Sequence, residues 1–259
     1  MRLLLTNDDG IYAEGLRALH RELSREAECL IVAPEAEQSA VGHAITLSRP
    51  LMVRRARRNG VYFGYAVAGT PADCVKLGIK ELSTEPVDLV VSGINRGANV
   101  GINVIYSGTV SAATEGTILG VPSIALSLDS HRDDADFSFA ARFARRLVSF
   151  IGQAKEIRNL TLNVNIPALA ESEIKGIVVT KQGSARLVEA FEKRNDPREH
   201  IYYWLAGETL LSEDEEMSSD AIALKKGMIS ITPIQYDLTR HSLIAHLKEA
   251  IEDFPLSDQ

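Results

Sequence analysis

Cysteine is scarce in this sequence, because only Cys29 and Cys74 occur among its 259 residues. The two are not spaced as a C-x-x-C pair, so the pattern of a redox or paired-cysteine zinc motif is absent. Cys29 lies in a strand-like run and Cys74 in a helix-like run, which favours buried, inert thiols. Free thiols of this kind are typical of a reducing compartment.

Long apolar runs and an excess of positive charge are also missing. The apolar stretch at the N-terminus is too short for a signal peptide, and no run reaches the length of a membrane-spanning helix. The formal net charge is −7, which does not favour binding to nucleic acid or to an anionic membrane. We therefore expect a cytoplasmic protein whose partners include neither a nucleic-acid polymer nor a membrane.

The glycine-rich motif of dinucleotide-binding enzymes is absent as well. G-x-G-x-x-G has to follow a strand directly, and no such motif follows Thr6 or Val91. This argues against a dinucleotide-binding oxidoreductase. The chain also has no internal repeat and no low-complexity linker, and its composition is that of an ordinary globular protein. We expect a single domain over 1–259.

Strand-like and helix-like segments alternate through about the first 181 residues, which we expect to form the core. The expected strands are 2–6, 29–33, 87–91, 121–128, 160–166 and 174–179, with a hairpin of 50–55 and 61–67 around Asn59 and Gly60. The expected helices are 15–25, 70–79, 109–119 and 137–151. This alternation predicts an α/β fold, with a Rossmann-like, mostly parallel sheet and helices on both faces.

The sequence changes in character after about residue 182, where polar and aromatic residues mix around an acidic run at 213–216. Strand-like pieces at 201–205 and 228–232 flank that run. We expect 182–234 to form an extension with a projecting hairpin, followed by a C-terminal helix within 235–259. The extension carries Tyr202, Tyr203 and Trp204, which favour packing against a partner subunit in a homo-oligomer, either a dimer or a tetramer.

Two adjacent aspartates, Asp8 and Asp9, follow the first expected strand. Asn7 and Gly10 beside them are typical of a tight turn, but a turn explains one carboxylate well and two poorly. Two close carboxylates repel each other unless a cation or a proton lies between them. Open α/β sheets bind ligands at the carboxyl ends of their strands. A carboxylate pair without nearby histidine or thiolate therefore predicts a hard cation: Mg²⁺, Mn²⁺ or Ca²⁺.

Neutral oxygen donors lie in other loops that we expect at the same edge of the sheet. Ser39 follows the second strand, and Asn95 and Asn99 follow the strand at 87–91. Serine and asparagine are common loop residues, so each alone is weak evidence for a ligand. Their convergence on the edge that carries the aspartate pair favours a hydroxyl and an amide oxygen in the shell of the cation.

A helix start at 106–109 offers a site for an anion. Free backbone N–H groups at a helix N-terminus bind anions, Ser107 and Thr109 add hydroxyls, and Gly108 lets a phosphate approach the backbone. A plain N-cap is the simpler interpretation. Beside a divalent cation, however, phosphate is the natural ligand, because such ions often bind protein and substrate phosphate together.

These motifs resemble those of the SurE family, the stationary-phase survival phosphatases of bacteria and archaea. The resemblance rests on residues 7–10, Ser39, 92–99, 106–115 and 227–233, and it is looser between about 185 and 225. It implies a divalent-metal-dependent phosphomonoesterase that hydrolyses nucleoside 5′- and 3′-monophosphates to nucleoside and phosphate. Some family members also degrade short polyphosphate.

The resemblance also implies roles for individual residues. The positions that match the metal ligands of the family are Asp8, Asp9, Ser39 and Asn95, which implies one divalent cation, Mg²⁺ or Mn²⁺, per subunit. The expected catalytic residues are Asp8, Asp9, Asn99, Ser107 and Thr109. Asn99, Ser107, Gly108 and Thr109 fall where the phosphate-facing loop of the family would lie and are expected to bind substrate. His43 is added to this set from its own position, four residues after Ser39. Of these, His43 is a candidate general acid for the leaving alkoxide, although a loop histidine is more often merely polar.

Two alternatives are open at this stage. Asp8 could attack phosphorus itself, although aspartyl-phosphate enzymes space their two acids as Asp-x-Asp. A signalling receiver module without hydrolase activity also carries an acidic pair after its first strand and binds Mg²⁺. It needs a phosphate-accepting aspartate at the end of its third parallel strand, where this chain has Ser92 and Gly93.

Four arginines bracket the turn of the expected hairpin: Arg54, Arg55, Arg57 and Arg58. A solvated, charged edge strand is the ordinary interpretation, since charge protects a sheet edge from aggregation. Attraction of a polyanionic substrate is the alternative.

Overall fold

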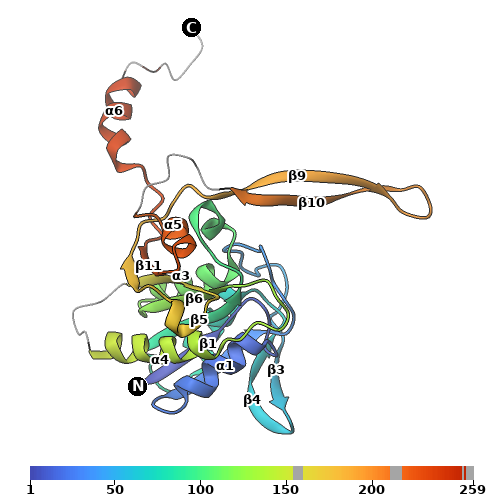
Figure 1. Ribbon diagram of the computed structural model, residues 1–259, viewed down its shortest axis with the longest axis vertical. Coiled ribbons are helices and arrows are strands. Elements are labelled where there is room, and N and C mark those ends of the chain that lie inside the picture. Colours follow the sequence, from blue (N-terminus) through green and yellow to red (C-terminus); the bar gives the residue numbers. More distant parts are fainter. Residues whose placement is uncertain (154–159, 211–217, 253, 255–259) are drawn as a thin grey trace.

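In the residues that the computed structural model describes, 1–153, 160–210, 218–252 and 254, a nine-stranded mixed sheet forms the centre (Figure 1). Across the sheet the strands are β3 (Val53–Arg58), β4 (Val61–Val67), β2 (Glu28–Pro34), β1 (Arg2–Thr6), β5 (Leu89–Arg96), β6 (Ser123–Asp129), β7 (Thr161–Pro167), β11 (Ile229–Ile234) and β8 (Ile177–Val179). Neighbours from β4 to β7 are parallel, whereas β3 and β11 run antiparallel to β4 and β7. The predicted mostly parallel α/β sheet is confirmed.

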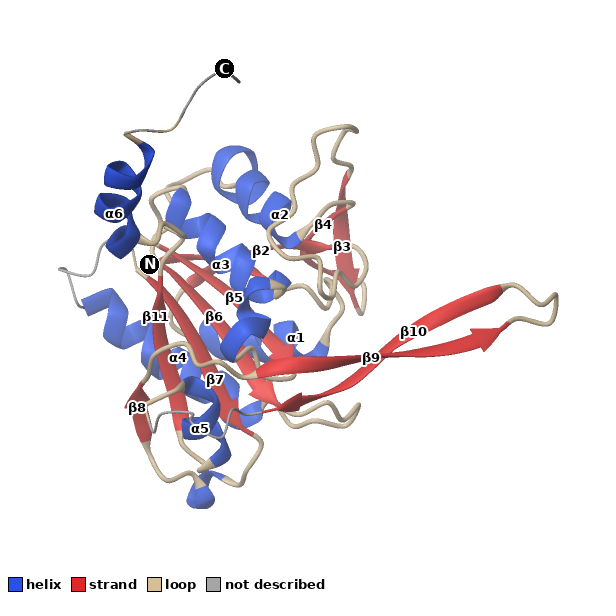
Figure 2. Cartoon of the chain, turned by 90° about the horizontal axis from the view of Figure 1, so that it is seen from above, coloured by secondary structure: helices blue, strands red, loops and turns tan. Residues whose placement is uncertain are grey.

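Helices cover both faces of this sheet (Figure 2). They are α1 (Glu14–Leu23), α2 (Pro71–Leu77), α3 (Gly108–Ile118), α4 (Ser138–Gln153) and α5 (Asp220–Lys225). Helix α6 (His241–Ile251) has no buried residue and stands apart from the sheet in Figure 1. On β1, Leu3 and Leu5 pack in the core cluster that contains α1 and α4, whereas Leu4 packs in the cluster with α2 and α3. Alternate side chains of a strand point to opposite faces, so a strand covered on both faces needs an unbroken apolar run.

The two cysteines lie in these elements, Cys29 in β2 and Cys74 in α2. Both thiols are free; Cys74 is buried and Cys29 is half-buried. Burial raises the pKa of the Cys29 thiol to about 12 and that of Cys74 well above its usual value. The prediction of inert thiols therefore agrees with their surroundings.

The order of the strands reverses between β1 and β5. From β1 the chain moves outward to β2 and β4, and it then returns through α2 to β5 on the other side of β1. Such a reversal leaves a crevice at the carboxyl ends of the two strands, which is where open α/β sheets bind ligands. Asp8 and Asp9 follow β1, and Asn95 lies near the end of β5, so the fold brings them to this crevice.

The hairpin β3–β4 turns at Asn59 and Gly60, both with positive φ, as the sequence predicted. Strand β3 is the edge of the sheet, and Arg54 and Arg55 on it are exposed. Arg58 instead pairs with Glu14 on α1. The expected helix at 70–79 ends earlier, because α2 passes into one π-helical turn at Gly78–Leu82.

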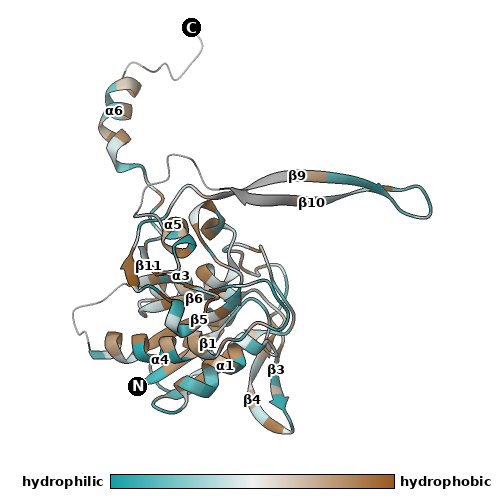
Figure 3. Cartoon of the chain, viewed as in Figure 1, coloured by the Kyte–Doolittle hydropathy of each residue, from teal (hydrophilic) through white to brown (hydrophobic). Residues whose placement is uncertain are grey.

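The late part of the chain adds a second, two-stranded antiparallel sheet of β9 (Arg186–Asn195) and β10 (Ile201–Leu210). This ribbon projects from the body in Figure 1, and Figure 3 shows hydrophilic residues toward its outer end. The sequence predicted a strand only at 201–205, and it missed β9 because charged residues interrupt its pattern. The acidic run at 213–216 lies outside the described residues. Beyond β11, α6 covers part of the predicted C-terminal helix.

A separate observation concerns membranes. Among the helices in the described parts of the chain, none combines the length and the apolar character needed to cross a bilayer.

Candidate active site

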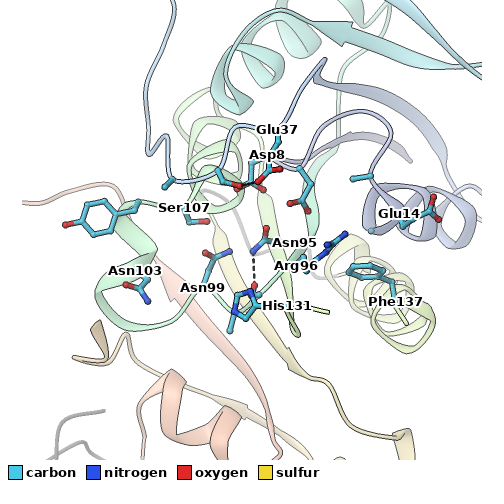
Figure 4. Close-up of a pocket in the computed structure, with 18 of the residues that line it drawn as sticks. Asp8, Glu14, Glu37, Asn95, Arg96, Asn99, Asn103, Ser107, His131 and Phe137 are labelled. Atoms are coloured by element: carbon cyan, nitrogen blue, oxygen red, sulfur yellow. Dashed lines mark hydrogen bonds between the residues drawn. The ribbon is translucent and has the colours of Figure 1, made fainter. Parts of the chain in front are cut away.

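A cavity of about 1070 Å³ opens at the carboxyl ends of β1 and β5 (Figure 4). The residues on its walls include Asp8, Asp9, Glu37, Ser39, Asn95, Arg96, Asn99, Ser107, His131 and Phe137. Six sequence-predicted site residues are therefore brought together here: Asp8, Asp9, Ser39, Asn95, Asn99 and Ser107. The other three predicted residues are His43, Gly108 and Thr109. The structure describes all three, and none of them lines the cavity.

The two aspartates are crowded carboxylates in a poorly solvated place. Burial raises the pKa of Asp8 above its usual range, and the hydrogen bond from Thr109 offsets only part of that rise. Burial and the neighbouring charge of Asp8 raise the pKa of Asp9 to about 6, although Arg96 acts in the opposite direction. Two acidic groups whose ionised forms are disfavoured in this way gain most from a positive charge placed between them.

Thr109 is directed toward Asp8 rather than into the cavity. Its hydroxyl is fully buried and donates a hydrogen bond to the Asp8 carboxylate. In this structure the hydroxyl is engaged with Asp8 and orients that carboxylate. Its expected contact with a phosphate stays a prediction.

Gly108 also serves Asp8 rather than the open cavity. A Cβ atom at Gly108 would lie 2.8 Å from the Cβ of Asp8, closer than carbon atoms pack. Only glycine therefore lets the start of α3 approach Asp8 this closely. Ser107 is the N-cap of α3, and its Oγ accepts a hydrogen bond from the Val110 N–H at 3.1 Å. The cap and the cavity wall are thus the same residue.

Ser39 reaches the cavity on the loop that follows β2. The Gln38 N–H donates to the Asp8 carbonyl at 2.8 Å, which ties this loop to the end of β1. The Ser39 hydroxyl donates to Glu37 Oε1 at 2.5 Å. Glu37 therefore adds a third carboxylate beside the aspartate pair, and its charge contributes to the raised pKa of both aspartates.

The asparagines present their amide oxygens because their nitrogens are occupied. Asn95 Nδ2 donates to the Gly97 carbonyl at 2.8 Å, the contact drawn as a dashed line in Figure 4. Asn99 Nδ2 donates to Ser127 Oγ at 2.9 Å. Amide oxygens of this kind suit a hard cation or a water molecule held by one.

His43 lies apart from the cavity. Its Nε2 is 2.8 Å from Glu115 Oε2, and Lys76 Nζ is 2.5 Å from the other oxygen of the same carboxylate. Burial by itself raises the pKa of Glu115, but the hydrogen bonds from His43 and Lys76 outweigh it, so the pKa is lowered. His43 therefore joins the Ser39 loop to α3 through a hydrogen bond, and it does not line the cavity where a general acid is expected.

Sequence reasoning missed two basic residues on the cavity wall. Arg96 lies there within the 92–99 motif and forms an ion pair with Asp133 at 2.5 Å. His131 lies across the cavity from Asp8, with Asn95 and Asn99 between them (Figure 4). A Cβ atom at Gly97 would be 2.4 Å from the imidazole Cε1, so the ring rests directly on that glycine. The position of His131 just after β6, at the same sheet edge, was the signal that could have found it.

The oxygen donors fit a hard divalent cation. Two carboxylates, a hydroxyl and an amide oxygen line one cavity, and burial raises the pKa of both carboxylates. In the described parts of the chain, no group of three or more histidine, cysteine, aspartate or glutamate side chains is placed to hold a metal ion. The arrangement therefore suits an ion that keeps some of its water ligands, and it suits a zinc-type site less well.

Comparisons with known proteins identify the family of this chain. A family model described as "Survival protein SurE" matches residues 3–189. A relative named 5′-nucleotidase SurE from Syntrophus aciditrophicus (strain SB) is 67% identical over 248 residues, which cover 96% of this chain and 93% of the relative. A 5′-nucleotidase SurE from Syntrophobacter fumaroxidans is 51% identical, with 94% and 97% covered. The crystal structure of the SurE protein from Aquifex aeolicus is similar at a TM-score of 0.82 and 40% identity, covering 96% of this chain and 99% of that one.

Proposed function

Because this chain belongs to the SurE family, we propose that it is a 5′-nucleotidase, which hydrolyses nucleoside 5′-monophosphates to nucleoside and phosphate. One observation of this structure carries the proposal. Asp8 and Asp9, adjacent in the sequence, both line a cavity large enough for a nucleotide, and the pKa of each is raised. Carboxylates in that state are arranged to bind a cation together with an anionic substrate.

We propose that Asp8, Asp9, Ser39 and Asn95 hold one divalent cation per subunit, either Mg²⁺ or Mn²⁺. When bound, such a cation supplies Lewis-acid polarisation of the phosphate and makes a nucleophilic water more acidic. Thr109 keeps Asp8 in the orientation that this set requires. The gap at Gly108 lets the positive end of α3 approach the same carboxylate.

The phosphate-binding side of the proposal rests on residues that face the cavity. Ser107 at the start of α3 and Asn99 line the cavity, and Arg96 adds a guanidinium at its wall. The ion pair of Arg96 with the exposed Asp133 is of the weak surface kind, so the guanidinium can exchange Asp133 for a phosphate oxygen. These donors position the phosphoryl group and offset its charge, which is the main task in phosphoryl transfer.

In this proposal His131, rather than His43, is the general acid. His131 lines the same cavity and lies across it from Asp8 (Figure 4), and the proposal puts the leaving-group end of the substrate on its side. A protonated imidazole there can give its proton to the leaving oxygen as the phosphorus–oxygen bond breaks. Neither a covalent intermediate on Asp8 nor a receiver module is favoured, since Thr109 engages Asp8 and β5 ends in Asn95 and Arg96 rather than in an aspartate.

The proposal has a direct test. Purified protein is assayed for phosphate release from AMP and from 3′-AMP with Mn²⁺ or Mg²⁺, and then after a chelator is added. We expect release from AMP that the chelator abolishes and that Asp8→Asn lowers by roughly a hundredfold or more. Release that persists in the chelator would contradict the cation, and no release from AMP with any metal would contradict the nucleotidase.

Short polyphosphate is a second candidate substrate, because β3 carries four arginines and one of them reaches a residue of the cavity wall. Arg58 pairs with Glu14, and Glu14 is among the residues that line the cavity. Replacing Arg54, Arg55 and Arg57 by serine should lower polyphosphate hydrolysis and leave AMP hydrolysis unchanged. An equal effect on both substrates, or on neither, would remove this role from the hairpin.

We also propose that the chain acts as a homo-oligomer in the cytoplasm, with β9–β10 as the contacting element. Tyr203 and Trp204 on β10 are more than half exposed, and Leu205 beside them lines the cavity. Apolar side chains on a projecting ribbon favour a partner that covers them.

A further inference from the structure

Strand β7 carries two asparagines where a buried parallel strand ordinarily carries apolar residues. Asn163 and Asn165 are fully buried, and they alternate with Leu162, Val164 and Ile166, which belong to the hydrophobic core. Residues two apart on a strand share a face, so both amides lie on the same side of the sheet. Burying an amide is unfavourable unless it is hydrogen-bonded, so the partners of these two amides show what they do.

Both amides bind the backbone of one residue, Asn99. Asn165 Oδ1 accepts a hydrogen bond from the Asn99 N–H at 2.8 Å, and Asn165 Nδ2 donates to the Asn99 carbonyl at 3.0 Å. Asn163 Nδ2 donates to the same carbonyl at 2.8 Å. The side chain of Asn165 thus replaces a neighbouring strand and pairs with Asn99 at both of its backbone polar groups.

The side chain of Asn99 is held by the next strand. Its Nδ2 donates to Ser127 Oγ on β6 at 2.9 Å, and Ser127 is paired in register with Asn165. The backbone and the side chain of Asn99 are therefore both fixed by the sheet behind the cavity. Asn99 itself is on the cavity wall, whereas the described Asn163 and Asn165 are not.

We propose that Asn165, supported by Asn163, is a positioning residue for phosphoester hydrolysis, which acts by fixing Asn99 at the cavity. The inference rests on the proposed function only in assigning Asn99 to the reaction. A fixed backbone at Asn99 keeps its amide oxygen in one place, and a displacement of about 1 Å in a reacting group can lower a rate roughly a hundredfold.

The chain offers a matched control on the adjacent strand. Ser230 on β11 is paired in register with Asn165 and is equally buried. Its hydroxyl bonds to Thr180 at 2.7 Å rather than to the loop at Asn99. Ser230→Ala therefore removes a buried polar contact in the same layer and leaves the Asn99 contacts in place.

The test is a double-mutant cycle in the full-length protein. Asn165→Ala, Asn99→Ala and the double variant are compared for kcat and KM with AMP and Mn²⁺, and the Tm of each is measured. We expect Asn165→Ala to lower kcat by roughly 10- to 100-fold. In the Asn99→Ala background the same change should have little further effect, because coupled sites are not additive. Ser230→Ala should lower Tm without lowering kcat.

Additive losses in the cycle, or an equal fall of kcat in Ser230→Ala, would overturn the proposal. Should Asn165→Ala fail to fold, Asn163→Ala is the second variant, because it removes one hydrogen bond to Asn99 and leaves both bonds from Asn165. We expect it to lower kcat by a smaller factor, and to have no such effect in the Asn99→Ala background.

Hydrogen exchange gives a readout that does not depend on catalysis. Amide exchange in residues 97–101 should accelerate in Asn165→Ala and remain unchanged in Ser230→Ala. If exchange accelerates in Asn165→Ala but the wild-type protein releases no phosphate, the proposed function is refuted and the role of Asn165 in fixing Asn99 is retained. Unchanged exchange in Asn165→Ala would refute the positioning role even if the wild-type protein is an active nucleotidase.

Discussion

At the scale of single residues, the site depends on carboxylates whose ionised forms are disfavoured. The pKa of Asp9 is raised from 3.8 to about 6 by burial and by the charge of Asp8. A raised carboxyl pKa means that the metal-free folded protein binds this proton more tightly than the unfolded chain does. The contribution of Asp9 to stability is therefore greatest below 3.8 and is lost as the pH rises to about 6.

A bound cation reverses that dependence, which gives a prediction for pH and metal together. The increase of Tm on adding Mn²⁺ should be small near pH 5 and should rise to a plateau above about pH 7, because protons compete with the metal for Asp9. Differential scanning fluorimetry across this range measures it. Asp9→Asn should abolish most of the increase. A Tm increase that is independent of pH would show that Asp9 does not bind the metal.

His131 supports a prediction about leaving groups. Nucleoside alkoxides are poor leaving groups and need a proton, whereas 4-nitrophenolate leaves without one. His131→Gln should therefore lower kcat for AMP by roughly a hundredfold and that for 4-nitrophenyl phosphate by much less. His43→Gln is the control, because its ring pairs with Glu115 away from the cavity. Equal losses on both substrates would assign His131 to binding or folding.

At the scale of elements, the start of α3 and the end of β1 form one unit. The two meet where Gly108 leaves room for Asp8 and Thr109 donates to it. Neither contact follows from the helix or the strand taken alone. The helix start was predicted as an anion site, but its first turn also anchors a carboxylate.

Gly108→Ala tests this unit. The added methyl group would lie 2.8 Å from the Asp8 Cβ, so Asp8 or the helix must shift. We expect weaker Mn²⁺ binding by roughly tenfold or more, with a smaller loss of Tm, since the clash is confined to the site. Isothermal titration measures the affinity. Gly116→Ala in the same helix meets Ser123 and Val90 instead, and it should lower Tm without changing metal affinity. Weakened binding in both variants would point to general distortion of α3.

At the scale of the whole molecule, the extension that carries the projecting ribbon also forms hydrogen bonds to the core. The Gly101 N–H donates to Asp220 at 3.0 Å and the Gly101 carbonyl accepts from Gln182 at 2.8 Å. The segment after Asn99 is thus tied to residues that lie beyond the core at 1–181. The division at residue 181 remains a prediction, but the parts on either side of it share the loop that lines the cavity.

The ribbon β9–β10 gives a prediction about assembly. Phe191, Tyr203 and Trp204 are each more than half exposed on it. Light scattering should therefore give a mass of at least twice the 28.3 kDa of one chain. Replacing Tyr203 and Trp204 together by serine should shift the mass toward the monomer, whereas Phe150→Ser on α4, equally exposed, should not. A wild-type monomer at micromolar concentration would contradict the assembly.

The sequence by itself determined the α/β fold and the oxygen donors that converge at one sheet edge. Both depend on local patterns: apolar runs specify buried strands, and residues that follow parallel strands share an edge. Only the tertiary structure decided which residues Thr109, His43 and Asn165 contact. Their hydrogen-bond partners are Asp8, Glu115 and Asn99, which lie 101, 72 and 66 residues away, respectively. Hydrogen bonds over such separations depend on how loops pack across the sheet, and the periodicity of a sequence carries no record of that packing.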